Sequence, residues 1–322
     1  MKLERSLPSA LGAIVAAFAC LGLLCGCTRA QESGTETKAG PPAETGTVDQ
    51  ASGKKFEEFA PDNFSAPTRI DNEWLPMKPG TRWVYGGTTI EDDGTAVPHR
   101  VEMIVTDLTK VIAGIRSVVV LDLDYSDGDL VEAELAFFAQ DNFGNVWHLG
   151  QYPEEYERGR LVAVLPWIHG IEDARAGIVM KARPQAGTPG YSQGWGPAVN
   201  WTDRAKVDRM GEKTRVPADH YEDVLVIAET SRTEPHAEQL KYYARGVGTV
   251  RVGWRGTGEK TRETLELMKI EQLGPKALAE VRAKALKLEK SAYKHSRNVY
   301  LHTSPAEPMS RTTRRERGGK GD

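Results

Sequence analysis

Alternating apolar and polar residues between Val118 and Gly150, interrupted by two glycine-containing turns, constrain the fold of this chain more than any other feature. Apolar residues at every second position are typical of a strand that buries one face. The alternating positions are Val119, Leu121, Leu123 and Tyr125 in the first run, Val131, Ala133, Leu135, Phe137 and Ala139 in the second, and Trp147 and Leu149 in the third. The segment therefore predicts a meander of three antiparallel strands.

The register of the first hairpin follows from the requirement that both apolar sets share one face. A two-residue loop, Asp127-Gly128, would place these sets on opposite faces of the sheet. A three-residue loop over 126–128 pairs Leu123 with Val131 and gives the glycine a left-handed conformation. We therefore predict the three-residue loop.

The second turn, at 142–144, gives the same solution with its own glycine at the left-handed position. It pairs Ala139 with Trp147 and Phe137 with Leu149. Because two independent turns agree on one buried face, the pattern predicts an antiparallel meander with a single apolar side.

Further short runs with strand character appear on both sides of the meander and are separated by turn residues. They lie at 81–86, 100–108, 177–180, 205–210, 224–230, 240–245, 249–254 and 265–270. Roughly nine or ten strands with short turns and no helix between them favour a mainly β fold, in which the meander forms a curved sheet, half-barrel or barrel.

One helix is expected after the strands, over 274–296. Pro275 occupies its first turn, and one apolar stripe follows at helical spacing. The stripe consists of Leu278, Val281, Ala285, Leu288 and Ala292. Such a helix would cover the sheet or the mouth of the barrel, or else would form a coiled coil with a partner.

The N-terminus has the features of an export signal. Lys2 and Arg5 precede an apolar run over 10–24, which has the length of a signal peptide and is too short to span a membrane. The run ends in Leu24-Cys25-Gly26-Cys27, which resembles the lipobox of bacterial lipoproteins. This resemblance implies cleavage after residue 26 and a lipid anchor on Cys27; the alternative is an ordinary secretion signal.

Thr28 follows the cysteine in place of the aspartate that retains lipoproteins at the inner membrane. We therefore expect a cell-envelope protein on the periplasmic face of the outer membrane, where the host has one. The predicted segments are a signal peptide (1–26), a disordered tether (27–63), an all-β domain (64–273), a helix (274–296) and a disordered basic tail (297–322).

Composition excludes several classes of function. The net charge of −3 and pI of about 6.2 give no indication of nucleic-acid binding. The chain has three cysteines, and two leave with the signal peptide if the third is lipidated. No thiol would then remain for a disulfide, a zinc–thiolate site or a nucleophile, and we expect no cofactor.

Several motifs resemble those of a family of uncharacterised bacterial secreted proteins and lipoproteins. They are LPMKPGTRWVYGG, VTDLTKVIAG, the turn DG-LVE, AQDNFGNVWHLG and YYARGVGTV, and together they cover roughly residues 65 to 270. The resemblance implies an all-β envelope domain and supplies no catalytic residues.

A serine-hydrolase motif, G-x-S-x-G, occurs at 190–194 and contains Ser192. Asp203 or Asp223, with His220 or His236, would complete a triad in hydrolase order. However, the motif needs a strand before the serine and a helix after it, and the flanking prolines and glycines at 183–197 indicate a loop. We therefore do not expect Ser192 to be a nucleophile.

Four carboxylates fall on the polar face of the first hairpin: Asp122, Asp124, Glu132 and Glu134. The predicted register sets Asp122 opposite Glu132, and like charges at such positions repel. These groups must be solvated, paired with cations, or bound to a divalent cation. Solvation is the favoured interpretation, and a weak metal site is the alternative.

Aromatic residues gather in the loop after 183, where Tyr191, Trp195 and Trp201 would line an apolar or sugar-binding cleft. The alternative is that they plug a sheet edge. The seven histidines, His148 among them, lack the spacing of metal ligands.

These features favour a non-catalytic envelope lipoprotein that binds an apolar or amphipathic ligand, or a partner protein, through a curved sheet. A secreted serine hydrolase using Ser192 and a weak cation-binding protein are the alternatives.

Overall fold

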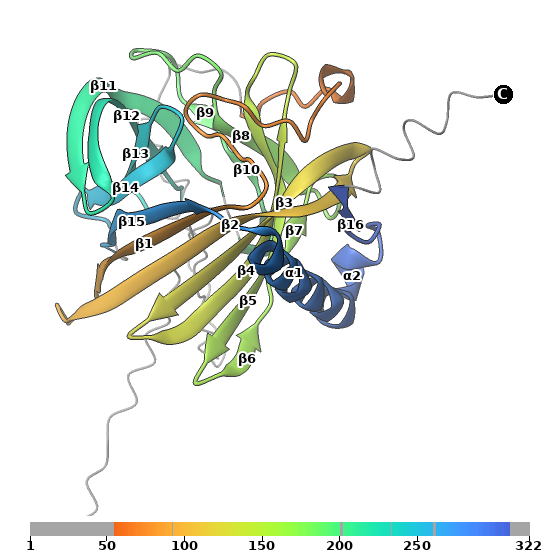
Figure 1. Ribbon diagram of the computed structural model, residues 1–322. Coiled ribbons are helices and arrows are strands. Elements are labelled where there is room, and N and C mark those ends of the chain that lie inside the picture. Colours follow the sequence, from red (N-terminus) through yellow and green to blue (C-terminus); the bar gives the residue numbers. More distant parts are fainter. Residues whose placement is uncertain (1–54, 92, 200–201, 233, 260–261, 310–322) are drawn as a thin grey trace, which may run out of the picture.

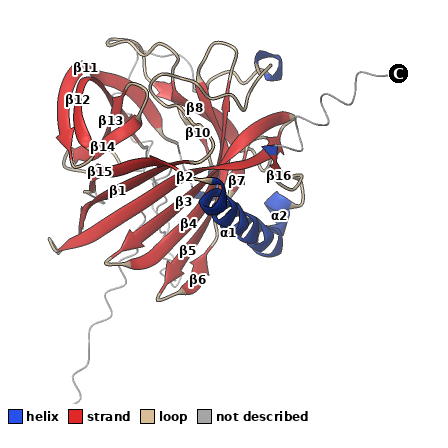
Figure 2. Cartoon of the chain, in the orientation of Figure 1, coloured by secondary structure: helices blue, strands red, loops and turns tan. Residues whose placement is uncertain are grey.

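The computed structural model describes residues 55–309 except 92, 200, 201, 233, 260 and 261. Within this part the chain is mostly strand and forms one 16-stranded antiparallel sheet that is not closed, followed by a C-terminal helix (Figures 1 and 2). The predicted fold class is confirmed. Cys27 and the predicted signal peptide lie outside the described residues.

The strands follow one another with short connections. They are β1 (Thr81–Ile90), β2 (Ala96–Ile112), β3 (Ile115–Ser126), β4 (Asp129–Gln140), β5 (Val146–Glu157), β6 (Arg160–Ala163), β7 (Trp167–Ile168), β8 (Arg175–Met180), β9 (Tyr191–Ser192), β10 (Gly194–Trp195), β11 (Arg204–Val216), β12 (Asp219–Thr230), β13 (Glu238–Ala244), β14 (Gly248–Arg255), β15 (Thr264–Gln272) and β16 (Glu307–Pro308). The helices are α1 (Pro275–His295) and α2 (Arg297–Tyr300), with 3-10 turns at Pro61–Asn63 and Pro197–Val199.

The sheet has two halves, one built from strands before residue 181 and one from strands after residue 203, and within each half most neighbouring strands are consecutive in the sequence. The path is β10-β8-β5-β4-β3-β2-β1-β15-β14-β13-β12-β11-β9, with β6 and β7 on β5, and β16 on β2. Hairpin connections account for most neighbours. Strand β1 pairs with β15 and so joins the half before residue 181 to the half after residue 203.

The first hairpin differs from the predicted register. Ser126 pairs with Asp129, so Asp127 and Gly128 form a two-residue turn with φ of 48° and 88°. Pairing then shifts by one residue, and Leu123 lies opposite Ala133 rather than Val131. The prediction of a three-residue loop was wrong because a β-bulge supplies the extra residue that keeps the apolar sets on one face.

The second turn has the predicted form. Ala139 pairs with Trp147, and Gly144 adopts a left-handed conformation with φ of 90°. The predicted pairing of Phe137 is wrong, because a bulge places Gly150 opposite it in place of Leu149. The bulge adds one residue to β5, so every pair beyond it is offset by one position from the predicted register.

Strands β2 to β5 are covered on both faces. We call the face that carries Leu121 and Leu135 the outer face, and the face that carries Val120 and Ala136 the inner face. Both pairs are buried. Helix α1 packs across the outer face in Figure 1, with contacts to β2 and β4. The inner face looks toward the second half of the sheet, so the strands bury their polar positions as well.

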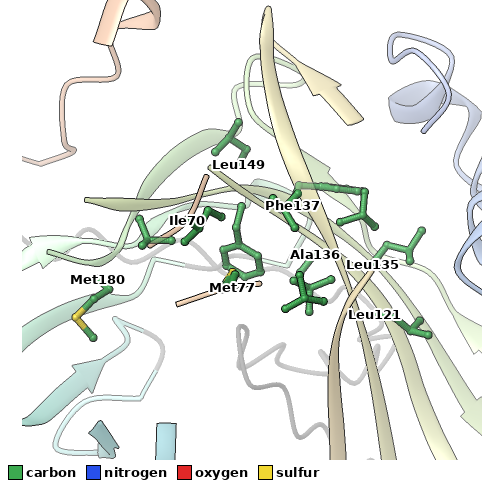
Figure 3. Close-up of a cluster of buried hydrophobic side chains, with 14 of the residues drawn as sticks. Ile70, Met77, Leu121, Leu135, Ala136, Phe137, Leu149 and Met180 are labelled. Atoms are coloured by element: carbon green, nitrogen blue, oxygen red, sulfur yellow. The ribbon is translucent and has the colours of Figure 1, made fainter. Parts of the chain in front are cut away.

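Segments outside the strands complete the core. Figure 3 shows Ile70 and Met77, which precede β1, in the same buried cluster as Ala136 and Phe137. Helix α1 buries the predicted stripe at Val281, Ala285, Leu288 and Ala292.

The folded part is wider than predicted at both ends. Before residue 64, the ring of Phe59 lies 5.4 Å from that of Trp147. After residue 296, helix α2 follows directly, and Glu307 pairs with Thr109 of β2. No helix in the described ranges has the length and apolar character needed to cross a bilayer.

The two ends of the sheet are brought together by one short segment. Strand β9 pairs with β11 and strand β10 pairs with β8, and Gln193 alone separates them in the sequence. Gly177 of β8 lies against this segment so closely that an added Cβ would overlap the backbone of Gln193 and Gly194. The 190–194 motif therefore spans the opening between the two sheet edges.

Replacement of Gly177 by alanine should destabilise the protein by about 1–3 kcal/mol, because backbone atoms cannot move aside as a flexible side chain would. Gly253→Ala is the matched control, since Gly253 also lies in a strand and an added Cβ there would meet open space. Its stability should stay within about 0.5 kcal/mol of wild type. Urea unfolding of both variants gives the comparison, and equal effects would contradict the close approach.

Candidate functional site

The inner face of the meander carries an acidic cluster, which consists of the half-buried Asp122 and the buried Asp124, Glu132 and Glu134. The two residues from β3 lie opposite the two from β4, in the pairs Asp122–Glu134 and Asp124–Glu132. The prediction that all four share a face is confirmed, although the partners are exchanged. The prediction that solvent surrounds them is wrong: Asp124, Glu132 and Glu134 are 2%, 7% and 2% exposed.

The burial of these carboxylates has a simple cause. The second half of the sheet closes over the inner face, so polar positions of β3 and β4 face protein rather than water. Carboxylates moved out of water are disfavoured in their charged form unless cations or hydrogen bonds compensate.

A buried histidine compensates one end of the cluster. His99 of β2 places Nε2 2.6 Å from Oδ1 of Asp124 and Nδ1 2.8 Å from Oε1 of Glu263. An imidazole donates from both nitrogens only when it is protonated. His99 therefore bridges two carboxylates as an imidazolium.

The titration of this end follows from the same contacts. Burial would lower the pKa of His99, but the hydrogen bonds and charges of Asp124 and Glu263 outweigh it and raise the pKa to about 10. Burial raises the pKa of Asp124 to about 6, against the lowering effect of His99.

The other end of the cluster has no such compensation. Burial raises the pKa of Glu134 to about 8. Burial, and then the charge of Glu134, raise the pKa of Asp122 well above its usual range. One oxygen of Glu134, Oε2, receives no hydrogen bond from the described residues.

Asp122 and Glu134 form part of the wall of an interior cavity. The space open to the centre of a water-sized sphere is about 50 Å³. The apolar part of the lining comes from the half of the sheet before residue 181 and from the segment before β1: Leu75, Met77, Trp83, Met103, Val105, Val120, Ala136, Phe138 and Val179. The cavity is thus amphipathic.

The opposite wall carries an ion pair. Lys241 of β13 places Nζ 2.7 Å from Oε2 of Glu229 on β12. Gln193, from the segment between the sheet edges, donates to the other oxygen of Glu229 at 2.6 Å. Both carboxylate oxygens of Glu229 therefore have partners.

The candidate nucleophile Ser192 lies in β9 and is buried. Its hydroxyl accepts a hydrogen bond from the amide of Gly194 at 3.2 Å. The flanking elements are short strands, so the strand–serine–helix arrangement of a hydrolase is not formed in the described chain. Arg204 of β11 pairs with Ser192 on one side and with Thr230, at one end of β12, on the other. His220 lies at the other end of β12, roughly 30 Å from Thr230 at the usual rise per strand residue.

The predicted aromatic cleft takes a different form. Tyr191 is buried in the core, with Nζ of Lys181 4.5 Å above its ring, and Trp195 lies half-buried in β10. Among the described residues of this loop, Gln193 lines the cavity instead. Trp201 lies outside the described residues.

The remaining predicted ligands do not assemble a metal centre in the described part of the chain. No three of its His, Cys, Asp or Glu side chains are grouped as metal ligands. His148 is buried against the rings of Phe138 and Trp167, and burial lowers its pKa to about 3.

Several residues of the site are not evident from the sequence. His99, Gln193 and Glu263 lie in unrelated segments with no shared motif. Lys241 and Glu229 have a weak signal, since each interrupts or ends an apolar strand run, at 240–244 and 224–228. A charge inside such a run indicates either a solvated face or a buried pair, and the sequence does not distinguish them.

The fold and the site define a mainly antiparallel β protein with an amphipathic interior cavity. No family model and no curated protein matches the chain. A solved structure from Bacteroides fragilis, described as an exported protein with a YmcC-like fold, has 12% identity and a TM-score of 0.34, over 62% of this chain and 99% of that one.

Another solved structure, described as a lipoprotein from Parabacteroides distasonis, has 14% identity and a TM-score of 0.30, over 62% of this chain and 100% of the other. Likeness of this degree assigns neither family nor function. The family resemblance of the sequence motifs stays an expectation.

Thermal stability should fall as the pH rises from about 5 to about 9. The folded-state pKa values of Glu134 (about 8) and His99 (about 10) lie above their ordinary values of 4.5 and 6.5. Each group contributes stability that is complete below its ordinary pKa and is lost as the pH rises through the folded-state pKa. We expect Tm to drop by about 5 °C or more over this range.

Glu134→Gln should flatten the part of this decline that lies between about pH 4.5 and 8, because glutamine cannot ionise. Asp129→Asn, at an exposed position of the same hairpin, is the control and should keep the wild-type slope. A wild-type Tm that rises from pH 5 to 9 would show that these carboxyls are not buried as described.

Proposed function

We propose that this protein is a non-catalytic, lipid-anchored binding protein of the cell envelope, whose interior cavity takes up a small amphipathic molecule. The observation that carries the proposal is the cavity itself, which combines a large apolar lining with a few converging polar groups. Binding sites for small molecules have this composition, with apolar contacts for affinity and polar contacts for orientation.

The size of the cavity limits the ligand. A water molecule needs roughly 10–15 Å³ of the same measure of space. The space of about 50 Å³ therefore suits three to five non-hydrogen atoms without movement of the walls. A short-chain molecule, or one end of a longer one, fits this description.

The envelope location rests on the sequence. The lipobox-like Leu24-Cys25-Gly26-Cys27 ends an apolar run of signal-peptide length. The stretch from Thr28 to about Lys55, which has almost no large apolar side chains, then leads to the folded domain. Lipidation of Cys27 would hold the domain near a membrane, and Thr28 favours the periplasmic face of the outer membrane. The tether would allow the domain to move clear of the lipid surface.

Binding can be measured by isothermal titration of the full-length protein with four-carbon alcohols, amines and acids. At least one of these molecules should bind with a Kd of about 1 mM or tighter. Ala136→Leu, which fills the cavity, should weaken that binding at least tenfold, roughly the loss of one favourable contact.

Ala96→Leu adds the same atoms at an exposed position of β2 and is the control. Its affinities should equal those of wild type. If no member of the panel binds wild-type protein, or if Ala136→Leu binds as tightly as wild type, the cavity is not the binding site.

The anchor is tested by fractionation of cells that express the full chain. Cys27→Ala should move the protein out of the membrane fraction, because the variant has no side chain there to acylate. Cys25→Ala, two positions away, should leave the distribution unchanged. Acylation of the N-terminal peptide, read by mass spectrometry, should be lost only in the first variant, and its absence in wild type would exclude the anchor.

A further inference from the structure

The two walls of the cavity differ in how well their charges are matched. On one wall Glu229 is paired with Lys241 and Gln193 through both oxygens. On the other wall Asp122 and Glu134 lie directly opposite each other across β3 and β4, and both line the cavity. This second wall therefore has an excess of carboxyl groups.

Glu134 shows the mismatch most directly. Its side chain is 2% exposed, and Oε2 has no hydrogen-bond partner in the described structure. A buried polar atom without a partner is unfavourable, and native proteins rarely keep one unless a water, ion or ligand satisfies it. Because Glu134 lines the cavity, an occupant of the cavity is in position to satisfy it.

The chemistry of that occupant follows from its neighbours. Two carboxyl groups at one end call for a group that donates several hydrogen bonds and carries positive charge. An ammonium group meets both requirements, since it has three donors on one compact cation. The remaining wall, formed by Trp83, Met103 and Phe138 among others, accommodates an alkyl chain.

We propose that the cavity binds a primary alkylamine, with its ammonium group between Asp122 and Glu134 and its alkyl chain against the apolar wall. This inference rests on the proposed binding function and specifies its ligand class. His99 does not serve this purpose, because its two nitrogens are engaged with Asp124 and Glu263 at the other end of the cluster.

The protonation state of Glu134 supports the assignment. With a pKa of about 8, Glu134 is mostly neutral at pH 7. An arriving ammonium favours the carboxylate, so the carboxyl proton passes to solvent as the salt bridge forms. Binding of one alkylammonium should therefore release close to one proton, whereas binding of a neutral alcohol should release none.

A divalent metal suits this wall less well. Calcium takes six to eight oxygen ligands. Here the described side chains around the cavity are largely apolar, and none of its His, Cys, Asp or Glu residues form a metal-binding group.

The test compares n-butylamine with n-butanol, which has the same number of non-hydrogen atoms and no charge. Isothermal titration of the full-length protein at pH 7 should give a Kd for butylamine at least tenfold lower than for butanol. Repetition in two buffers of different ionisation enthalpy gives the number of protons released. Octylamine in parallel distinguishes a free short amine from the head group of a longer amphiphile, which would gain affinity from the added chain.

Asp122→Asn and Glu134→Gln should each abolish the preference for the amine, and Glu134→Gln should also abolish proton release. Both are close in shape to the neutral acid, and unchanged butanol binding would show that the variants fold. Asp129→Asn is the exposed control on the same hairpin.

The outcomes separate the two proposals. Equal affinities for butylamine and butanol would overturn the amine assignment and leave the binding function in place. Binding of neither would overturn both. Saturable stabilisation by calcium chloride that is lost in Asp122→Asn would also overturn the amine assignment, in favour of a metal.

Discussion

The position of the C-terminal helix on the sheet depends on a buried cation, Lys110 of β2. Lys110 of β2 is fully buried, and its ammonium contacts Glu289 at 2.8 Å and the carbonyl of Ser304 at 2.7 Å. The rings of Tyr293 and Tyr300 flank it at 5.3 Å and 4.8 Å. A charge buried in this way is tolerated only with its partners in place, so it fixes where the helix and the following segment lie. The helix in this position covers the outer face of β2 and β4.

Strands β2 to β5 are covered on both faces, and this explains why the sequence predicts some features of the structure and not others. Alternation identified the meander and set Asp122, Asp124, Glu132 and Glu134 on one face, because a bulge preserves the parity that a two-residue turn would break. Their burial was not predictable. The elements that cover the inner face come from the other half of the chain, and a period-2 pattern reads the same whether the polar face meets water or another layer.

The 190–194 motif illustrates a second limit. Its glycines resemble those of a strained turn around a reactive serine, and backbones do approach closely in this part of the sheet. The approach, however, is between Gly177 and the segment that spans the sheet edges. The side chain of this segment that lines the cavity is Gln193, which donates a hydrogen bond to Glu229. A glycine-rich sequence can indicate a close backbone contact, but it does not identify the distant segment that makes the contact.

The pairing of β1 with β15 has a consequence for how the chain folds. Near this junction Gln272 donates a hydrogen bond to the carbonyl of Pro79, 193 positions earlier. Strands β1 to β5 can pair with neighbours soon after they are synthesised, yet one edge of β1 stays bare until β15 exists. Long-range pairing of this kind is slow, and a bare edge is a template for other chains. The interval between the synthesis of these two strands is therefore the period in which newly made copies are most exposed to aggregation.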